Sequence, residues 1–427
     1  MKKRVIAILG VCAIVGSVLG GCAREQSPGA GSEPENLTVG AADAVYCYAE
    51  EPEFSAVQAF SKEIFRESLD DTNPVLSPVS AYLALALTGA GANGETAEEF
   101  AEAMGDNHQA VSERMMENFS AEGEGIKVIL ANSAWVDNRL QPNEEWVQAA
   151  AGSFDAEVYR TKLSDAKVVD SINTWIEDKT EGLIKDFLSG PMSEDARLAL
   201  LNTVYFKGEW ERPFEANDTL ERPFILESGT EVQTEMMSKY DEEMTYVSSE
   251  ICDGIVMPYK NSDLKFVALK PVEGMTVREI YNELDMAQIG EMLENAQSRK
   301  VALWIPKFEV TFDRKLNEDL QSMGITSAFD PERADFSGIG TTESGNPLYI
   351  DLVRQKAVFI LDEEGTEAAA TMVMMNQCCA LEPELPLEVH FDKPFLYMIL
   401  DPETDVPLFM GVMDDPSMSG EAVVACD

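Results

Sequence analysis

The sequence predicts an α+β fold built on large sheets that are mixed or mainly antiparallel. Helical patterns occupy the first half of the chain, whereas strand-like runs dominate from residue 198 onward. The chain has no internal repeat and no regular alternation of strand and helix, so a parallel α/β sheet is disfavoured. Its 427 residues, 45% of them hydrophobic, suffice for one large domain or two ordinary ones.

The predicted helices follow from apolar spacing. Residues 54–69 carry apolar side chains at helical intervals. The next helix starts at Ser77-Pro78, with proline in a first-turn position, and is apolar on nearly every side, so we expect it to be buried. Thr96 to Glu99 fits a capping box for a third helix. Further helical patterns cover 109–119, 143–153 and 169–178.

The predicted strands are runs of apolar and β-branched residues. One of them, 126–136, interrupts the helical half of the chain. The others lie beyond it, at 198–206, 255–259, 264–269, 301–312, 350–361 and 395–400.

The N-terminus has the pattern of a targeting segment. Lys2-Lys3-Arg4 precedes an apolar run from Val5 to Val18, which is too short for a comfortable membrane span. Leu19-Gly20-Gly21-Cys22 resembles the bacterial lipoprotein processing box, in which Cys22 carries the lipid. An ordinary cleaved secretory peptide or a tail-in anchor is the alternative. We expect a leader over 1–21, a flexible tether over 22–45 and an extracytoplasmic, cell-surface lipoprotein anchored to the cytoplasmic membrane.

Charge and residue usage exclude several classes of function. A formal charge of −45 disfavours nucleic acid as a partner, because repulsion opposes approach. The cysteines left beyond Cys22 are odd in number and contain no C-x-x-C pair, so neither a zinc site nor a disulfide framework is indicated. The two histidines, His108 and His390, give no sign of a nucleophile beside an imidazole. We expect no enzymatic activity, cofactor or metal.

The segment from Glu363 to Thr371 follows the strong strand pattern at 356–361. With period-2 alternation, its even-numbered residues share one uncharged face that continues into Met372 and Met374. Glu367 falls on the opposite face. The segment could therefore join a sheet without burying a charge. A short alanine-rich helix fits the local pattern equally well.

Five separated segments carry motifs that lie in one order along the chain. They are Ser77 to Ser80, 172–184 with Asn173 and Trp175, Asn202 to Trp210 with Pro213-Phe214, 363–371, and 394–411. Together they resemble the serpin family over about residues 54 to 416. The resemblance implies three β-sheets, about eight or nine helices and an exposed reactive-centre loop. We assign the domain to 46–417 and an acidic tail to 418–427.

The resemblance also implies a mechanism. A serpin offers its loop to a protease, is cleaved to an acyl-enzyme, and inserts the freed loop into its largest sheet before deacylation. We therefore expect an irreversible suicide-substrate inhibitor that acts as a monomer and forms a covalent complex with its target. The alternatives are a non-inhibitory serpin that is merely cleaved, and a lipoprotein that binds small solutes.

Residue roles follow from the same resemblance. The loop hinge comprises Glu363, Gly365, Thr366, Ala368, Ala369, Ala370 and Thr371. Polar groups of the shutter, beneath the place where the sheet opens, are Ser77, Ser80, Asn202 and Gln355. Gln355 stands where many animal members carry histidine, so a histidine-dependent opening is not expected. Trp210 matches the tryptophan at the breach, where the loop first enters, and Glu363 with Lys307 matches the ion pair there.

The usual hinge spacing places the scissile bond at Cys379-Ala380. Counting back from the strand at Phe391 gives Pro383 instead; we prefer Cys379, because the length of the inserted segment determines where the protease is trapped. The loop lacks arginine and lysine, so the expected targets are elastase-like or subtilisin-like serine proteases or papain-like cysteine proteases.

Overall fold

The computed structural model describes residues 33–39, 53–69, 72–342, 347–350, 352–366, 385–419 and 422–424. The predicted leader, Cys22, hinge residues 368–371 and the predicted scissile bond Cys379-Ala380 lie outside these ranges. No helix within them has the length and apolar character that a membrane crossing requires.

Helices occupy the first half of the chain, as predicted, with ends that shift by a few residues. They are α1 (Ser55–Arg66), α2 (Pro78–Gly89), α3 (Gly94–Met104), α4 (His108–Phe119), α5 (Glu144–Phe154) and α6 (Ala166–Lys179). Three short helices were not predicted: α7 (Val277–Glu283), α8 (Met286–Glu294) and α9 (Asn317–Ser322). The first two open with capping boxes, Thr276 with Glu279 and Asp285 with Gln288, so the sequence carries a signal for them.

Helix α2 is the buried helix that the sequence predicts. The Ser77 hydroxyl accepts a hydrogen bond from the Ser80 N–H at 3.2 Å, and Pro78 takes the first helical position. Every residue of α2 except Ala84 is buried. Its N-terminus is therefore fixed inside the molecule, where polar side chains need partners.

The predicted capping box at Thr96 and Glu99 is wrong. Helix α3 begins at Gly94, so Thr96 lies inside its first turn. The Thr96 hydroxyl accepts from the Asp335 N–H at 3.0 Å, and the Glu99 carboxylate accepts from the Thr326 and Ser327 N–H groups at 2.8 and 2.7 Å. These two side chains tie α3 to a distant segment instead of capping their own helix.

A six-stranded sheet is centred on β4 (Ile126–Asp137) and β7 (Leu198–Glu209), which pair antiparallel from Ile126 opposite Gly208 to Val136 opposite Leu198. Its other strands are β1 (Glu35–Asn36), β3 (Ala121–Gly123), β6 (Ala156–Thr161) and β16 (Gly365–Thr366). The two-residue strand β16 pairs with the end of β7 and occupies the open edge of this sheet.

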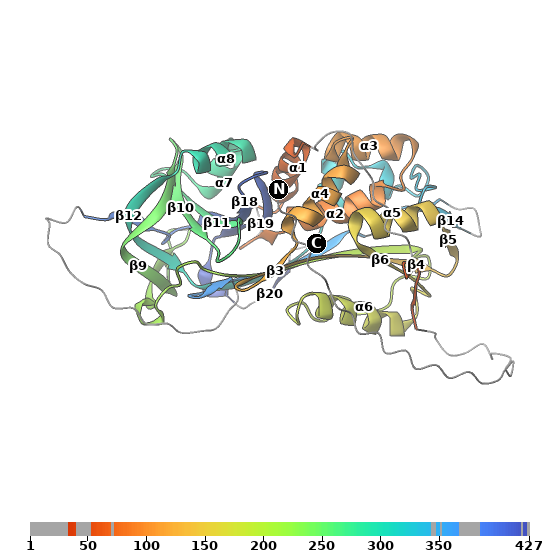
Figure 1. Ribbon diagram of the computed structural model, residues 1–427, viewed down its shortest axis with the longest axis horizontal. Coiled ribbons are helices and arrows are strands. Elements are labelled where there is room, and N and C mark those ends of the chain that lie inside the picture. The colour runs from red at the N-terminus through yellow and green to blue at the C-terminus, as the bar shows by residue number, and fades with distance from the viewer. Residues whose placement is uncertain are drawn as a thin grey trace, which may run out of the picture. The chain divides into compact units, whose positions relative to one another are not determined.

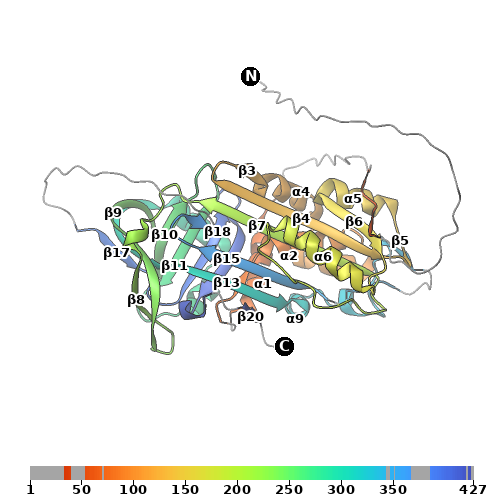
Figure 2. The ribbon, with the colours of Figure 1, turned by 90° about the horizontal axis from the view of Figure 1, so that it is seen from below.

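A second ladder contains β13 (Phe308–Lys315), β15 (Arg354–Leu361) and β20 (Ala422–Val424). In the described residues, no ladder joins β15 to β7. Val358 of β15 nevertheless packs into the same apolar cluster as Leu201 of β7, so the two strands lie near each other. Figure 2 shows β15 and β13 running alongside β7 and β4.

The nine-stranded sheet forms the other large part of the fold. It contains β2 (Val75–Leu76), β8 (Leu220–Ile225), β9 (Glu231–Ser248), β10 (Cys252–Pro258), β11 (Lys265–Pro271), β12 (Gln297–Pro306), β17 (Leu387–His390), β18 (Phe395–Asp401) and β19 (Val406–Met413). The predicted single run 301–312 is thus two strands in different sheets, since the chain leaves β12 at Pro306. A small sheet pairs β5 (Leu140–Pro142) with β14 (Gly340–Thr342).

Helices cover both faces of the β4–β7 sheet, as Figure 1 shows, with α6 on one side and α2, α4 and α5 on the other. On the α6 side, Ile172 and Trp175 join Trp135 and Leu201 in a separate apolar cluster. On the α2 side, even-numbered residues of β7 such as Val204 and Phe206 contact the main core. Neighbouring residues of β7 therefore face two different cores.

Two short segments outside the predicted domain 46–417 pair with strands of its sheets. Glu35 and Asn36, inside the predicted tether 22–45, pair with β6. Residues 422–424, inside the predicted tail 418–427, pair in parallel with β13. Both short segments add backbone hydrogen bonds to sheet edges, a role that composition alone does not reveal.

Candidate functional site

The chain reverses direction between β15 and β16 in a turn organised by Asp362. Its Oδ1 accepts from the N–H groups of Glu364 at 2.9 Å and Gly365 at 3.0 Å, and its own N–H donates to the Gly365 carbonyl at 3.0 Å. An aspartate that bonds the backbone two and three residues later is typical of turns. The motif Asp362 to Gly365 could have revealed this turn in the sequence, but Asp362 was not among the predicted site residues.

The hinge residues Gly365 and Thr366 already pair with β7. Gly365 lies opposite Glu209, and Thr366 opposite Gly208, in an antiparallel ladder. The approach leaves no room for a side chain at residue 365, because a Cβ there would lie 2.0 Å from the Gly208 carbonyl oxygen. The start of the predicted hinge is therefore the start of a strand at the edge of the sheet.

Trp210 and Phe214 hold the turn from the β7 side. The Trp210 N–H donates to the Glu364 carbonyl at 2.8 Å, and its indole Nε1 donates to the Asp362 carbonyl at 3.0 Å. The Phe214 N–H donates to the Glu363 carbonyl at 2.7 Å. The Trp210 ring stacks on Tyr259 with centroids 4.8 Å apart, which fixes the indole for these bonds.

The Glu363 carboxylate bonds two other segments. The Lys307 ammonium lies 2.8 Å from Oε2, and the Thr219 hydroxyl donates to Oε1 at 2.9 Å. Partial burial raises the pKa of Glu363, but the bonds from Lys307 and Thr219 outweigh this effect and hold that pKa below its usual value. The carboxylate thus stays ionised at neutral pH and connects the turn to the residue that follows β12.

The predicted shutter residues meet beneath β7 and β15. The Ser80 hydroxyl bonds the Asn202 side-chain oxygen, and the Asn202 amide donates to the Asn132 side-chain oxygen at 2.6 Å. The Asn132 amide in turn donates to the Phe154 carbonyl at 2.7 Å. Asn132 was not predicted; in the β4–β7 ladder it lies directly opposite Asn202.

Gln355, in β15 of the second ladder, also contacts the N-terminus of α2. Its amide oxygen accepts from the Ser77 N–H at 2.9 Å, and its amide nitrogen donates to the Ser77 carbonyl at 2.9 Å. The N-terminus of α2 therefore contacts β7 through Ser80 and β15 through Ser77. The polar groups of this buried region are satisfied by one another.

The structure brings the described site residues into two groups. Trp210, Lys307, Glu363, Gly365 and Thr366 surround the turn after β15. Ser77, Ser80, Asn202 and Gln355 surround the N-terminus of α2. Strands β7 and β15 run from one group to the other. Thr219, Asp362 and Asn132 are the members that sequence reasoning missed, and Phe214 was named only as part of a motif.

Both histidines contact neighbouring groups of the fold. His108 contacts the Gly105 carbonyl through Nδ1, and His390 stacks on Trp304 at 3.9 Å between ring centroids. No group of three or more potential metal ligands occurs in the described part of the chain.

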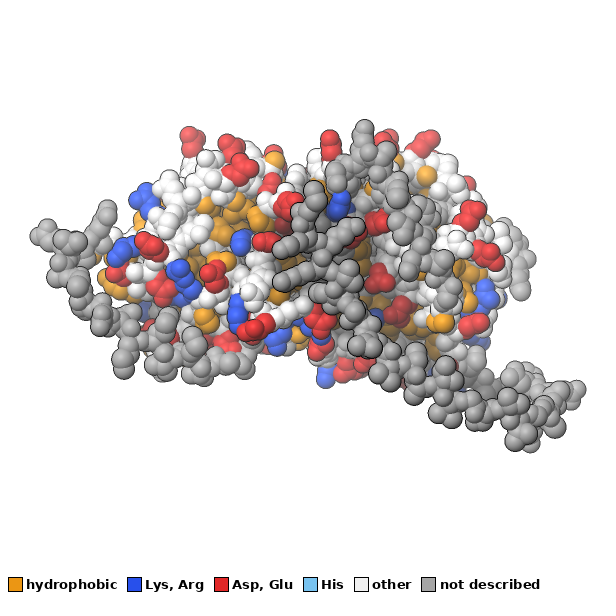
Figure 3. Space-filling model, in the orientation of Figure 1, with side chains coloured by type: hydrophobic (Ala, Val, Ile, Leu, Met, Phe, Trp, Pro, Cys, Tyr) orange, Lys and Arg blue, Asp and Glu red, His pale blue; other side chains and the backbone are white. Residues whose placement is uncertain are grey.

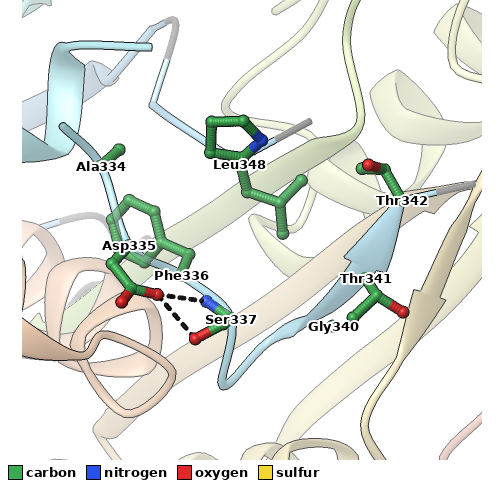
Figure 4. A pocket seen from close by; sticks show the side chains of 9 residues that line it. Ala334, Asp335, Phe336, Ser337, Gly340, Thr341, Thr342 and Leu348 are labelled. Carbon is green, nitrogen blue, oxygen red and sulfur yellow. Dashed lines mark hydrogen bonds between the residues drawn. The ribbon is translucent and has the colours of Figure 1, made fainter. Parts of the chain in front are cut away.

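A pocket of about 160 Å³ lies away from both groups, between 334–342 and 347–348 (Figure 4). Its carboxylate, Asp335, already accepts from the Ser337 N–H and hydroxyl at 3.1 and 2.6 Å. We assign this pocket no chemical role.

Comparison with known proteins identifies relatives over nearly the whole folded chain. The family model for serpins, described as serine protease inhibitors, matches residues 55–416. A protein named serine protease inhibitor from Cyanea capillata is 30% identical over 364 residues, which cover 81% of this chain and 93% of that protein.

Solved structures agree. The thermophilic serpin tengpin in its native state has a TM-score of 0.82 at 31% identity, covering 90% of this chain and 100% of its own. Tengpin in its latent state has a TM-score of 0.73 at 30% identity, covering 86% and 99%. Thyroxine-binding globulin in complex with thyroxine has a TM-score of 0.75 at 25% identity, covering 85% and 98%.

Proposed function

Because the chain belongs to the serpin family, whose members are generally protease inhibitors, we propose that it traps a target protease irreversibly. The protease cleaves a bond within the loop that follows residue 366, and the cleavage forms an acyl-enzyme. The freed loop then enters the sheet between β7 and β15 and carries the protease with it before deacylation. The chain itself supplies the cleavable loop and the free energy of loop insertion, and it catalyses no reaction.

The observation that carries this proposal is the pairing of Gly365 and Thr366 with the end of β7. If the same register continued, residues 368, 370, 372 and 374 would lie opposite 206, 204, 202 and 200. Leu200, Val204 and Phe206 contact the main core, and Asn202 bonds Ser80 on the same face, so the inserted face would carry alanine, alanine, methionine and methionine onto it. Glu367 would lie opposite Lys207 on the other face, which favours the pair electrostatically.

The same register supports the preferred scissile bond. β7 begins at Leu198, so residues 365–376 would span its whole length. Cys379 would then lie opposite Asp195, just beyond the strand, whereas Pro383 would lie four residues farther along. A bond at Cys379-Ala380 matches the available strand more closely.

Insertion is favourable because it completes the sheet. About ten inserted residues would form on the order of ten backbone hydrogen bonds, each contributing about 0.5–1.5 kcal/mol net. Burial of the two methionines adds roughly 1.5–3 kcal/mol each. The intact form is then metastable and persists because of a kinetic barrier, as serpin loop insertion illustrates generally.

The site of action that we propose is outside the cytoplasmic membrane of a bacterium, with Cys22 lipidated and the chain monomeric. The basic start, apolar run and Leu19-Gly20-Gly21-Cys22 box support this. Acidic side chains are scattered over the face seen in Figure 3 and not gathered into one patch, which fits a soluble surface more than a dedicated charged docking site.

The second candidate is a serpin that binds a ligand without inhibiting a protease. The neighbour named as thyroxine-binding globulin complexed with thyroxine motivates it. A loop that is cleaved without trapping the protease would be its signature.

Incubation with pancreatic elastase and denaturing gel electrophoresis distinguishes the two. A covalent complex supports inhibition, and cleavage without a complex supports the second candidate. Mass spectrometry of the released C-terminal peptide identifies the bond, Cys379-Ala380 or one up to four residues later. If cleavage leaves the thermal midpoint no higher than that of the intact protein, the stored free energy that inhibition requires is absent.

A further inference from the structure

Lys239 of β9 is a buried cation that contacts the segment after β7. Its side chain is only 5% exposed. The ammonium donates to the Pro213 carbonyl at 2.8 Å and to Oε2 of Glu242 at 3.2 Å, and it lies 4.8 Å from the ring centroid of Phe214. Burial lowers the pKa of Lys239, and the Glu242 carboxylate opposes that shift. A buried ammonium costs free energy, which these three contacts must offset.

One peptide group connects Lys239 with the hinge. The carbonyl of Pro213 and the N–H of Phe214 belong to the same peptide bond. The oxygen accepts from Lys239, and the N–H donates to the Glu363 carbonyl at 2.7 Å. A cation at the oxygen polarises the peptide group and strengthens its N–H as a donor, because hydrogen bonds in a chain polarise one another.

We propose that Lys239 is a positioning residue for loop insertion, which holds the Pro213–Phe214 peptide against Glu363 and thereby slows advance of the hinge along β7. This inference rests on the proposed function, since only a chain that inserts its loop has an insertion rate to be set. Lys239 acts through this peptide group.

Glu242 is the exposed end of this arrangement. Its side chain is 42% exposed, and it lines a surface pocket of about 250 Å³ together with Lys239 and Trp210. The Glu242 carboxylate therefore lies at the surface while it contacts the buried ammonium of Lys239. Removing its charge weakens the hold of Lys239 on the peptide without opening the core.

The test is hydrogen–deuterium exchange on the intact protein without protease. Lys239→Met keeps the apolar stem and removes the charge. We expect exchange at the amides of 362–366 and of Phe214 to become about tenfold faster, as loss of a charge-assisted hydrogen bond implies. A synthetic peptide with the sequence of residues 366–379 should also insert faster. Lys239→Arg, which still donates from a cation, should restore both rates.

Lys300→Met is the matched control. Lys300 pairs with Asp241 at 3.0 Å on the neighbouring strand and is 51% exposed, so its loss should leave hinge exchange unchanged. Should Lys239→Met fail to fold, Glu242→Gln replaces it, with an expected acceleration of about threefold.

A lower unfolding midpoint with unchanged exchange at 362–366 would show that Lys239 is merely structural and would overturn the inference. The readout does not depend on inhibition. Faster hinge exchange without any covalent complex would therefore reject the proposed function, whereas a normal complex with unchanged exchange rejects the role of Lys239.

Discussion

The ammonium of Lys307 lies 2.8 Å from Oε2 of Glu363, and this contact ties the residue after β12 to the turn after β15. The carboxylate is largely buried, with 14% of its side chain exposed, while the lysine is 40% exposed. The pair therefore restrains the first residues of the hinge from the solvent side. Solvent screening keeps its contribution modest.

Lys307→Met should shorten the lifetime of the active form. The hinge then loses one of its restraints, and spontaneous loss of inhibition should accelerate about two- to fivefold. Titrating the remaining active fraction with elastase during storage at constant temperature measures this rate. Lys300→Met, which removes a more exposed ion pair elsewhere, should leave the lifetime unchanged. Equal lifetimes for the two variants would contradict the restraint.

Thr366→Arg should convert an inhibitor into a substrate. Residue 366 lies opposite Gly208, and a Cβ on Gly208 would lie 2.6 Å from Tyr259, so that side of the sheet has no spare room. Residue 366 already pairs with β7 at the sheet edge, so insertion of the residues that follow it would bury an arginine there. We expect elastase to cleave the variant with little covalent complex on denaturing gels. Thr341→Arg, at an exposed position of β14, should trap normally; full trapping by Thr366→Arg would refute the hinge assignment.

The sequence anticipates the elements whose patterns are strong. Helices α1 and α2 are recognisable in the sequence because their buried positions require apolar residues, at helical spacing in α1 and on nearly every side in α2. β9 escapes prediction because it pairs with β8, β10 and β12 through its backbone while carrying many charged side chains. The division of the predicted run 301–312 at Pro306 could not be predicted either, because both halves have strand-like sequences. Only tertiary structure assigns them to different sheets.

Some residues of the candidate site could be predicted from the sequence, and others depend on tertiary structure. Glu363, Lys307 and Gln355 were found through resemblance, since nothing local brings residues 307 and 363 together. Asn132 was missed because its importance comes from lying opposite Asn202. A partner set by strand register is invisible until the register is known.

Thr203→Val should stabilise the intact form and not the cleaved form. The Thr203 hydroxyl is buried and has no hydrogen-bond partner within the described residues. Continuing the β16 register would bring Thr371 opposite Thr203, where threonine pairs bond across strands. Valine removes a cost of about 1 kcal/mol before insertion and a bond afterward. Thermal midpoints of the intact and cleaved forms should therefore move closer together.

Thr88→Val is the control for that experiment. The Thr88 hydroxyl already donates to the Ala84 carbonyl at 2.9 Å, so its loss should lower both midpoints or neither. If Thr203→Val behaved in the same way, Thr203 would have no special partner in the inserted state.

Asp414→Asn should raise stability at neutral pH. Burial raises the pKa of Asp414 to about 6, while Arg278 opposes the shift, and Oδ2 has no hydrogen-bond partner in the described residues. Because the folded-state pKa lies above the unfolded one, ionisation destabilises the fold fully above about pH 6 and not below about pH 4. At pH 7.5 the free energy of unfolding measured with urea should rise by about 3 kcal/mol, because each unit of pKa shift is worth about 1.4 kcal/mol, and it should equal the wild-type value near pH 4. A pH-independent difference would contradict this.

Gln355→His should introduce a pH dependence at the N-terminus of α2. Gln355 both accepts from and donates to the backbone of Ser77, at 2.9 Å each. A neutral imidazole also has one donor and one acceptor, but an imidazolium has two donors and would face the Ser77 N–H with another N–H. Burial also disfavours the charge, so the pKa of the introduced histidine should fall below its usual value of about 6.5. The unfolded chain then binds more protons, and stability should drop as the pH falls through about 6.5, by about 1.4 kcal/mol for each unit by which the folded-state pKa is lowered.

Unfolding midpoints of Gln355→His at pH 8 and pH 5.5 measure the effect, with Gln297→His, at an exposed position, as the control. Parallel pH profiles for the two variants would mean that residue 355 is not held against the N-terminus of α2 in solution.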